Sequence, residues 1–205
     1  MKYSLKATSI IEAIVVLLII VTGVVGMYSI YIQSIRLSEG TAEKIQAIQI
    51  AREGIEAMIQ VRDTNWNIFS DYENCWNSFH YDSGCISNNS ATTDIPAGSY
   101  IIYKGNDGFW NLIPRTSGSY TGSYINSFDT GFAVGKESSG FYTQSGGLAT
   151  GLMNPRYTRE IRISYPGGDS NSGEMNIISL VQWSNRNSLE VKTVELDTVL
   201  TNWRD

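Results

Sequence analysis

The sequence has few charged residues and no excess of basic ones. Among its 205 residues, 15 are Lys or Arg and 20 are Asp or Glu, so the formal net charge is −5. A protein that binds nucleic acid through a basic surface carries the opposite balance, so this class is excluded. The hydrophobic fraction of 42% is too high for a disordered chain. Only one long hydrophobic run is present, which excludes a membrane protein with several spans.

Residue patterns typical of catalysis are also missing. His80 is the only histidine, so a Ser-His-Asp or Cys-His mechanism would have to be built around it. The sequence contains no phosphate-binding loop, no Gly-x-Ser-x-Gly motif and no zinc-binding helix motif. The segment from Asp169 to Glu174 lacks the ligand spacing of an EF-hand loop and is predicted to form a turn. We therefore expect no enzymatic activity, no cofactor and no metal site.

The single apolar run lies near the N-terminus. Between Ile10 and Ile32 the only charged residue is Glu12. As an α-helix this run would be about 34 Å long, enough to cross a hydrocarbon core of about 30 Å. Lys2 and Lys6 precede it, so the positive-inside rule keeps the N-terminus in the cytoplasm and places the rest outside. A cleaved secretory signal is the lesser alternative, because its apolar core is usually only about 7–15 residues long.

The residues around Glu12 resemble the start of a known family of filament proteins. Type IV prepilins, and the pseudopilins of type II secretion and DNA uptake, begin with a segment similar to Lys6-Ala7-Thr8-Ser9-Ile10-Ile11-Glu12-Ala13-Ile14-Val15. The resemblance implies that prepilin peptidase cuts after Ala7, where the family usually has glycine, and that the new amine of Thr8 is methylated. It also implies that Glu12 neutralises the N-terminal amine of a neighbouring subunit in the filament. A buried carboxylate is tolerated when an ammonium group pairs with it.

The sequence becomes amphipathic beyond Ile32, which predicts that the helix continues to about Arg62. Apolar residues recur there at spacings of three and four, and polar residues separate them. This predicted buried stripe consists of Ile45, Ile48, Ala51, Ile55, Met58 and Ile59. A coiled coil is the alternative, but the stripe lasts less than three heptads, so docking onto a sheet is favoured. The segment Arg62-Asp63-Thr64-Asn65 is typical of a helix end, and Trp66 and Trp203 are expected to cover an apolar edge.

The two cysteines, Cys75 and Cys85, are predicted to form a disulfide. A domain outside the cytoplasm lies in an oxidising environment, where such pairs form and persist. A zinc site is the alternative, because His80 lies between the cysteines and three acids lie nearby. These acids are Asp71, Glu73 and Asp82. The separation of the two thiols does not match the close pairing of structural zinc sites, so the disulfide is favoured.

The sequence pattern of the C-terminal half predicts β-strands. Residues 99–104 and 109–113 flank the turn signal Gly105-Asn106-Asp107-Gly108 and predict a hairpin. Residues 115–151 predict long loops or short edge strands, and residues 157–165 predict one further strand. A second hairpin is expected from 175–183 and 189–200, with a bulge between Val191 and Val194. The predicted fold is α+β, a long N-terminal helix packed on an antiparallel sheet, and the pilin resemblance implies the same arrangement.

These patterns divide the chain into four parts and predict a structural function. The parts are a leader (1–7), a membrane and assembly helix (8–32), its amphipathic continuation (33–64) and an extracytoplasmic β domain (65–205). We expect a minor or major pilin or pseudopilin that serves adhesion, DNA uptake or secretion. It would lie first in the inner membrane and then in an extracellular filament. Its partners would be other pilin subunits, prepilin peptidase and the assembly machinery. The alternative is a single-pass surface binding protein that does not polymerise; an anchored hydrolase has the least support.

Overall fold

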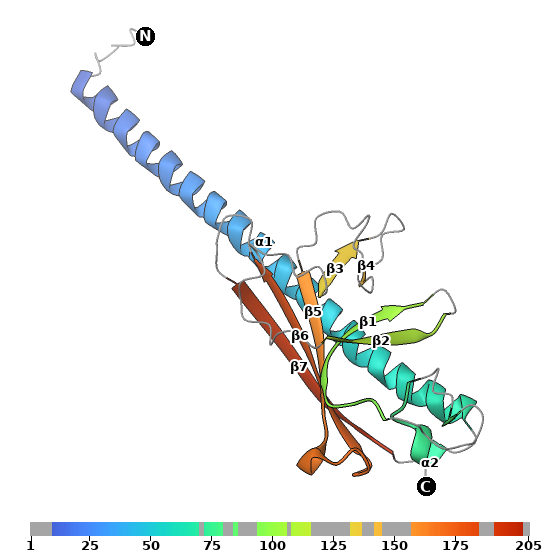
Figure 1. The fold of residues 1–205 in the computed structure, drawn as a ribbon. Helices are drawn as coiled ribbons and strands as arrows, with labels where there is room; N and C mark the ends of the chain where they lie inside the picture. Colours follow the sequence, from blue (N-terminus) through green and yellow to red (C-terminus); the bar gives the residue numbers. More distant parts are fainter. Residues whose placement is uncertain are drawn as a thin grey trace, which may run out of the picture. The chain divides into compact units, whose positions relative to one another are not determined.

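A computed structural model of the chain describes most of the long helix and the sheet (Figure 1). The described residues are 10–69, 72–79, 84–85, 94–105, 108–115, 132–136, 142–144, 157–184 and 191–202. The chain forms two compact units, Met1–Glu43 and Lys44–Asp205, and the helix α1 (Ile10–Ile68) contributes to both. In the first unit, every described residue belongs to α1. The second unit contains the rest of α1 and the sheet, so the predicted α+β fold is confirmed.

The strands of the second unit pair in antiparallel fashion throughout. Their bounds are β1 (Gly98–Lys104), β2 (Trp110–Arg115), β3 (Ala133–Lys136), β4 (Tyr142–Thr143), β5 (Tyr157–Ser164), β6 (Glu174–Ser184) and β7 (Val191–Thr201), with short helices α2 (Tyr72–Cys75) and η1 (Pro166–Gly168). The β1–β2 hairpin and the short strands β3 and β4 match the sequence-based expectations. The predicted turn after β5 is also present, as η1 and the residues that follow it.

Strand β5 is the central strand, and two different strands share one of its edges. One edge pairs with β6 along its whole length, and β6 in turn pairs with β7. On the other edge, β3 pairs with the start of β5 at Tyr157 and Thr158. Strand β1 pairs with the end of β5, at residues 161–163. The sheet therefore has a split beside Arg159, where β3 stops and β1 has not begun.

Two buried polar side chains fill this split. The amide of Gln144 donates to the carbonyl oxygens of Phe132, at 3.0 Å, and Arg159, at 2.7 Å. Its Oε1 atom accepts from Nε of Arg159 at 2.9 Å. The guanidinium of Arg159 also donates to the carbonyl oxygens of Ile102 in β1, at 3.0 Å, and Ile50 in α1, at 3.2 Å. Backbone groups that the split would leave unpaired thus find partners, and one side chain links the helix to two strands.

The buried charge of Arg159 has one acidic neighbour on the helix. Nη1 of Arg159 lies 3.5 Å from Oε1 of Glu53, and the side chains are 1% and 36% exposed. Burial lowers the pKa of the Arg159 guanidinium, while the attraction and the hydrogen bond of Glu53 act in the opposite direction. The charge is therefore held mainly by hydrogen bonds to carbonyl oxygens and only partly by its acid.

Small residues, rather than the predicted isoleucines, lie at the closest contact between α1 and the sheet. The residues of this part of α1 that are buried are Ala47, Ile50, Ala51, Gly54, Ala57, Met58 and Val61. A Cβ atom at Gly54 would lie 2.7 Å from Oγ of Ser179 and 2.8 Å from Cδ1 of Ile161, which is closer than real contacts allow. Ala51 and Met58 were predicted correctly, and Ile48, Ile55 and Ile59 are partly buried, whereas Ile45 is 51% exposed. The buried stripe is thus rotated from the prediction, because close packing selects side chains of small volume.

The helix ends later than predicted. It continues past Arg62 to Ile68, and Asn65, which was expected at the helix end, lies within the helix and is fully buried. The amide of Asn65 donates to the carbonyl oxygens of Trp76, at 3.1 Å, and Ser78, at 2.6 Å. The side chain of Asn65 therefore binds a neighbouring segment of the chain, while the backbone of Asn65 stays helical.

The structure tests two further expectations, one for Trp66 and one for strand β7. Trp66 is buried, and its indole nitrogen donates to Oδ1 of Asn202 at 3.2 Å, whereas Trp203 lies outside the described residues. The bulge predicted in β7 is wrong, because the pairing with β6 is continuous from Glu174↔Thr201 to Ser184↔Val191. Val191 simply lies on the other face of β7 from Val194. Apolar residues can therefore lie on both faces of an edge strand without the extra residue of a β-bulge.

We expect a large loss of stability when Arg159, the centre of this junction, is replaced. In Arg159→Met, the oxygens of Gln144, Ile102 and Ile50 lose the hydrogen bonds that the guanidinium donates, so we expect the free energy of unfolding to fall by about 3 kcal/mol or more. Urea unfolding of the full chain in detergent, followed by tryptophan fluorescence, measures the change. The matched control is Arg52→Met on the exposed face of α1, which should change the free energy by less than about 0.5 kcal/mol. Equal effects of the two variants would contradict the role of the junction.

Candidate functional site

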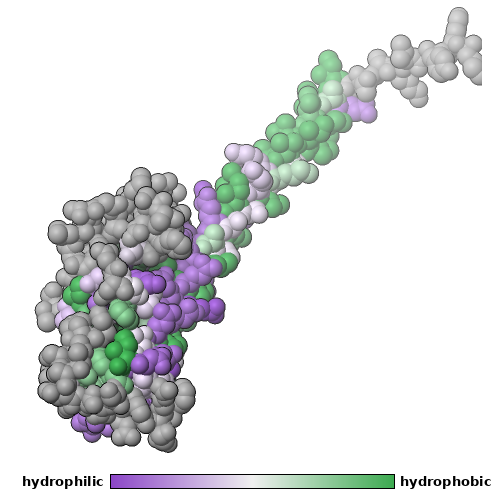
Figure 2. Space-filling view, turned by 90° about the vertical axis from the view of Figure 1, so that its right-hand side faces the viewer, coloured by the Kyte–Doolittle hydropathy of each residue, from purple (hydrophilic) through white to green (hydrophobic). Residues whose placement is uncertain are grey.

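The apolar part of α1 in the first unit is the candidate functional site. Every residue from Ile10 to Tyr31 is exposed, and the large apolar side chains in this range are 49% to 79% exposed. Figure 2 shows this hydrophobic surface along the helix. Its length and composition are sufficient for α1 to cross a membrane, and none of its most apolar window is buried by the protein itself. The helix is therefore compatible with a single membrane span.

One side of this segment carries its carboxylate and its smallest residues. Glu12 lies in the first turn of α1, and Gly23 and Gly26 follow about three and four turns later, so all three project from the same side. A Cβ atom built at either glycine meets no other atom within 4 Å. Small residues of this kind let two helices approach closely in lipid. Within the described part of the chain, no basic side chain forms an ion pair with Glu12.

The processing residues Ala7 and Thr8 lie outside the described residues, so cleavage and methylation there stay predictions. Glu12 is described, and it is the one predicted site residue that the structure describes within the first unit. The sequence also left His80 and its acidic neighbours Asp71 and Asp82 as alternative metal ligands, and these too lie outside the described residues. Among the residues that are described, no group of three His, Cys, Asp or Glu side chains could hold a metal ion.

Cys75 and Cys85 form the predicted disulfide, with their Cα atoms 5.9 Å apart. Both are buried and pack with Phe69, which directly follows α1. Oγ of Ser78 donates to the carbonyl oxygen of Cys75 at 2.7 Å and lies 3.4 Å from Sγ of Cys85. The disulfide therefore belongs to the packed region at the end of α1, where Asn65 also binds the same segment. The thiols are not available to a metal, which removes the zinc alternative.

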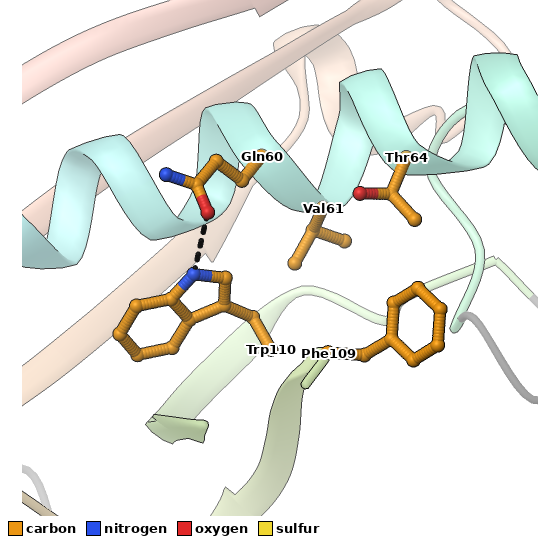
Figure 3. A pocket seen from close by; sticks show the side chains of 5 residues that line it. All are labelled: Gln60, Val61, Thr64, Phe109 and Trp110. Carbon is orange, nitrogen blue, oxygen red and sulfur yellow. Dashed lines mark hydrogen bonds between the residues drawn. The ribbon is translucent and has the colours of Figure 1, made fainter. Parts of the chain in front are cut away.

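A shallow notch lies between α1 and the β1–β2 hairpin (Figure 3). The space that it encloses is about 10 Å³, room for about one water molecule, and its lining residues are Gln60, Val61, Thr64, Phe109 and Trp110. The indole nitrogen of Trp110 donates to Oε1 of Gln60 at 2.8 Å, so the ring is fixed at the rim. Ligand pockets usually enclose about 300–1,000 Å³. The notch is too small to hold a substrate-sized molecule.

Sequence reasoning missed the buried junction of Arg159 and Gln144. A signal for Arg159 was present, because it alternates with Ile161 and Ile163 and so occupies an inward position of β5. A long polar side chain in phase with core residues indicates a buried hydrogen-bonding role. Gln144 carried no such signal, since it lies two residues beyond Tyr142 in a stretch without periodicity.

Comparisons with models of protein families, with curated proteins and with solved structures find no match for this chain. The features of the chain that bear on its function are the exposed apolar helix, the single carboxylate in it, and the disulfide-containing domain.

The disulfide predicts the outcome of a thiol assay on the natural protein. After denaturation without a reductant, the purified full chain should show no free thiol, and two thiols should appear after reduction. The reduced protein should lose about 2–3 kcal/mol of unfolding free energy, because a closed loop restricts the unfolded chain. Two reactive thiols in the unreduced sample would contradict the prediction.

Proposed function

We propose that this protein is a structural subunit of a type IV pilus-like filament, a minor or major pilin or a pseudopilin. It is inserted into the inner membrane as a precursor with residues 1–7 inside, cut after Ala7 and methylated at Thr8. The mature chain then assembles with other subunits through α1. The observation that carries the proposal is Glu12, the only charge between Ala7 and Ile35 of an apolar helix that its own chain does not bury.

The physical cost of Glu12 supports an assembly role. A carboxylate deep in a membrane helix costs about 2.5–3.5 kcal/mol on insertion scales. A helix that served only as an anchor would gain nothing from this residue. An ammonium group within ion-pair distance offsets the cost, and the amine of Thr8 in a neighbouring subunit would supply one. The glycines at 23 and 26 lie on the same side as Glu12 and would let the neighbouring helix approach.

The second unit fits the exported part of such a subunit. Its buried Cys75–Cys85 disulfide is typical of an oxidising compartment, outside the cytoplasm. Lys2 and Lys6 on the other side of the apolar run favour the same orientation. Surface display in a filament suits adhesion, DNA uptake or secretion, and the prepilin peptidase and assembly machinery would be its partners during export. A surface binding protein that stays in the membrane as a monomer is the outcome that the following experiments would reveal instead.

The proposal predicts the N-terminus of the mature protein. Mass spectrometry of the protein from membranes or filaments should find a chain that begins at methylated Thr8. Ala7→Gly should be processed faster than the natural sequence, because glycine is the residue that the family usually has before the cut. An intact Met1, or a start near residue 40, would overturn the prepilin assignment.

Glu12 provides the test of assembly. In Glu12→Ala, the charge pair with the neighbouring amine is lost, so we expect little or no incorporation into filaments while membrane insertion is unchanged. Immunoblots of sheared filaments and of membrane fractions measure the two quantities separately. Glu39→Ala, which removes an exposed acid of the same helix beyond the apolar run, is the matched control and should assemble normally. Normal assembly of Glu12→Ala would contradict the charge-pairing role of Glu12, whereas absence of the unaltered protein from the filament fraction would favour the non-polymerising membrane protein.

A further inference from the structure

Three neighbouring hydroxyl groups interrupt the apolar surface of α1. They belong to Tyr28, Ser29 and Tyr31, and the two tyrosines are 64% and 62% exposed. Within the part of the chain that the structure describes, none of the three has a hydrogen-bond partner. Tyr28 and Tyr31 are three positions apart, so they lie next to each other on one side of the helix.

The hydroxyl of Thr22, only six residues earlier, has a different environment. It lies 2.9 Å from the carbonyl oxygen of Leu18 and 3.0 Å from that of Ile19, so the helix itself satisfies it. A hydroxyl that is satisfied in this way can lie in hydrocarbon, whereas an unpaired hydroxyl loses its hydrogen bonds to water there. Thr22 is therefore compatible with the membrane interior, and the three later hydroxyls need water or lipid headgroups.

Length alone does not place the end of the span. A helix from Ile10 to Met27 is about 27 Å long, and one from Ile10 to Ile32 is about 34 Å long. Both lengths are compatible with a hydrocarbon core of about 30 Å. The shorter span leaves the unpaired hydroxyls outside the hydrocarbon, and the longer one buries them all. Tyrosine is also enriched where the hydrocarbon meets the headgroups, because its ring is apolar and its tip is polar.

We propose that, in the membrane-inserted protein, the hydrocarbon ends between Met27 and Tyr28. Tyr28 and Tyr31 hold the helix at this depth by placing their hydroxyls among the lipid headgroups. The proposed function contributes only one premise, that the precursor spans a bilayer. The apolar run up to Ile32 then divides into a hydrocarbon span and a headgroup segment, and the first basic residue beyond it, Arg36, lies in water.

Cysteine labelling of the full chain in its membrane tests this boundary. Single substitutions Val25→Cys, Ser29→Cys and Ile35→Cys are made with the natural disulfide retained. The probe is a charged maleimide that cannot cross lipid, and it is added to vesicles opened so that it reaches both faces. We expect Ser29→Cys and Ile35→Cys to react at similar rates and Val25→Cys to react several-fold more slowly.

Two other outcomes have separate meanings. If Ser29→Cys is as protected as Val25→Cys while Ile35→Cys reacts, the boundary lies nearer Ile32; this inference then fails, but the span and the proposed function stand. If all three positions react equally fast, no span exists, and both this inference and the membrane-inserted precursor are overturned.

A double substitution tests the anchoring role of the tyrosines. In the Ser29→Cys background, Tyr28→Ala with Tyr31→Ala makes the run to Ile32 more uniformly apolar, so the helix can enter more deeply. We expect the labelling rate of position 29 to fall several-fold. Tyr28→Trp with Tyr31→Trp is the matched control, because tryptophan also prefers the headgroup region, and it should retain the rate. An unchanged rate in the alanine pair would overturn the anchoring role.

Discussion

The guanidinium of Arg159 connects parts of the second unit that lie far apart in the sequence. Two strands share one edge of β5, and such a split leaves backbone groups in the interior without ladder partners. Arg159 and Gln144 supply the missing hydrogen bonds, and Arg159 also donates to the backbone of α1 at Ile50. Because an unpaired buried polar group costs about 1–3 kcal/mol, this arrangement holds the helix, β1 and β5 in one register. The charge itself is secondary to the hydrogen bonds.

Small residues on α1 are the second condition for this arrangement. The backbone of Ile50 can reach Arg159 only because Gly54 lets the helix approach Ser179 and Ile161 closely. In the first unit, Gly23 and Gly26 present a similar small surface, and no atom of a described residue lies within 4 Å of a Cβ built at either one. The same helix thus uses small residues twice. In one case the sheet is the partner, and in the other we infer that the partner is the helix of another subunit.

Patterns with one local cause were predicted well from the sequence. The β1–β2 hairpin follows from its turn residues, and the disulfide follows from two cysteines in a domain that the sequence predicts to be exported. Predictions were wrong where a segment far away in the sequence sets the environment of a residue. Asn65 looked like a helix end, but its partners Trp76 and Ser78 lie beyond the helix, and Ile45 looked buried although the sheet contacts a different side of α1. For the candidate site, Glu12 could be identified because its environment is set by its own neighbours.

The sequence by itself determined the apolar helix, its single carboxylate, the amphipathic continuation and the approximate positions of several strands along the chain. These features depend on hydropathy, on helical and strand periods and on turn chemistry, all of which act over a few residues. Only the tertiary structure decided which side of α1 meets the sheet, which strands share the edge of β5, and why an arginine lies in the core. These features depend on complementary volumes and on hydrogen-bond partners more than forty residues away, such as Arg159 with Ile50 and Ile102.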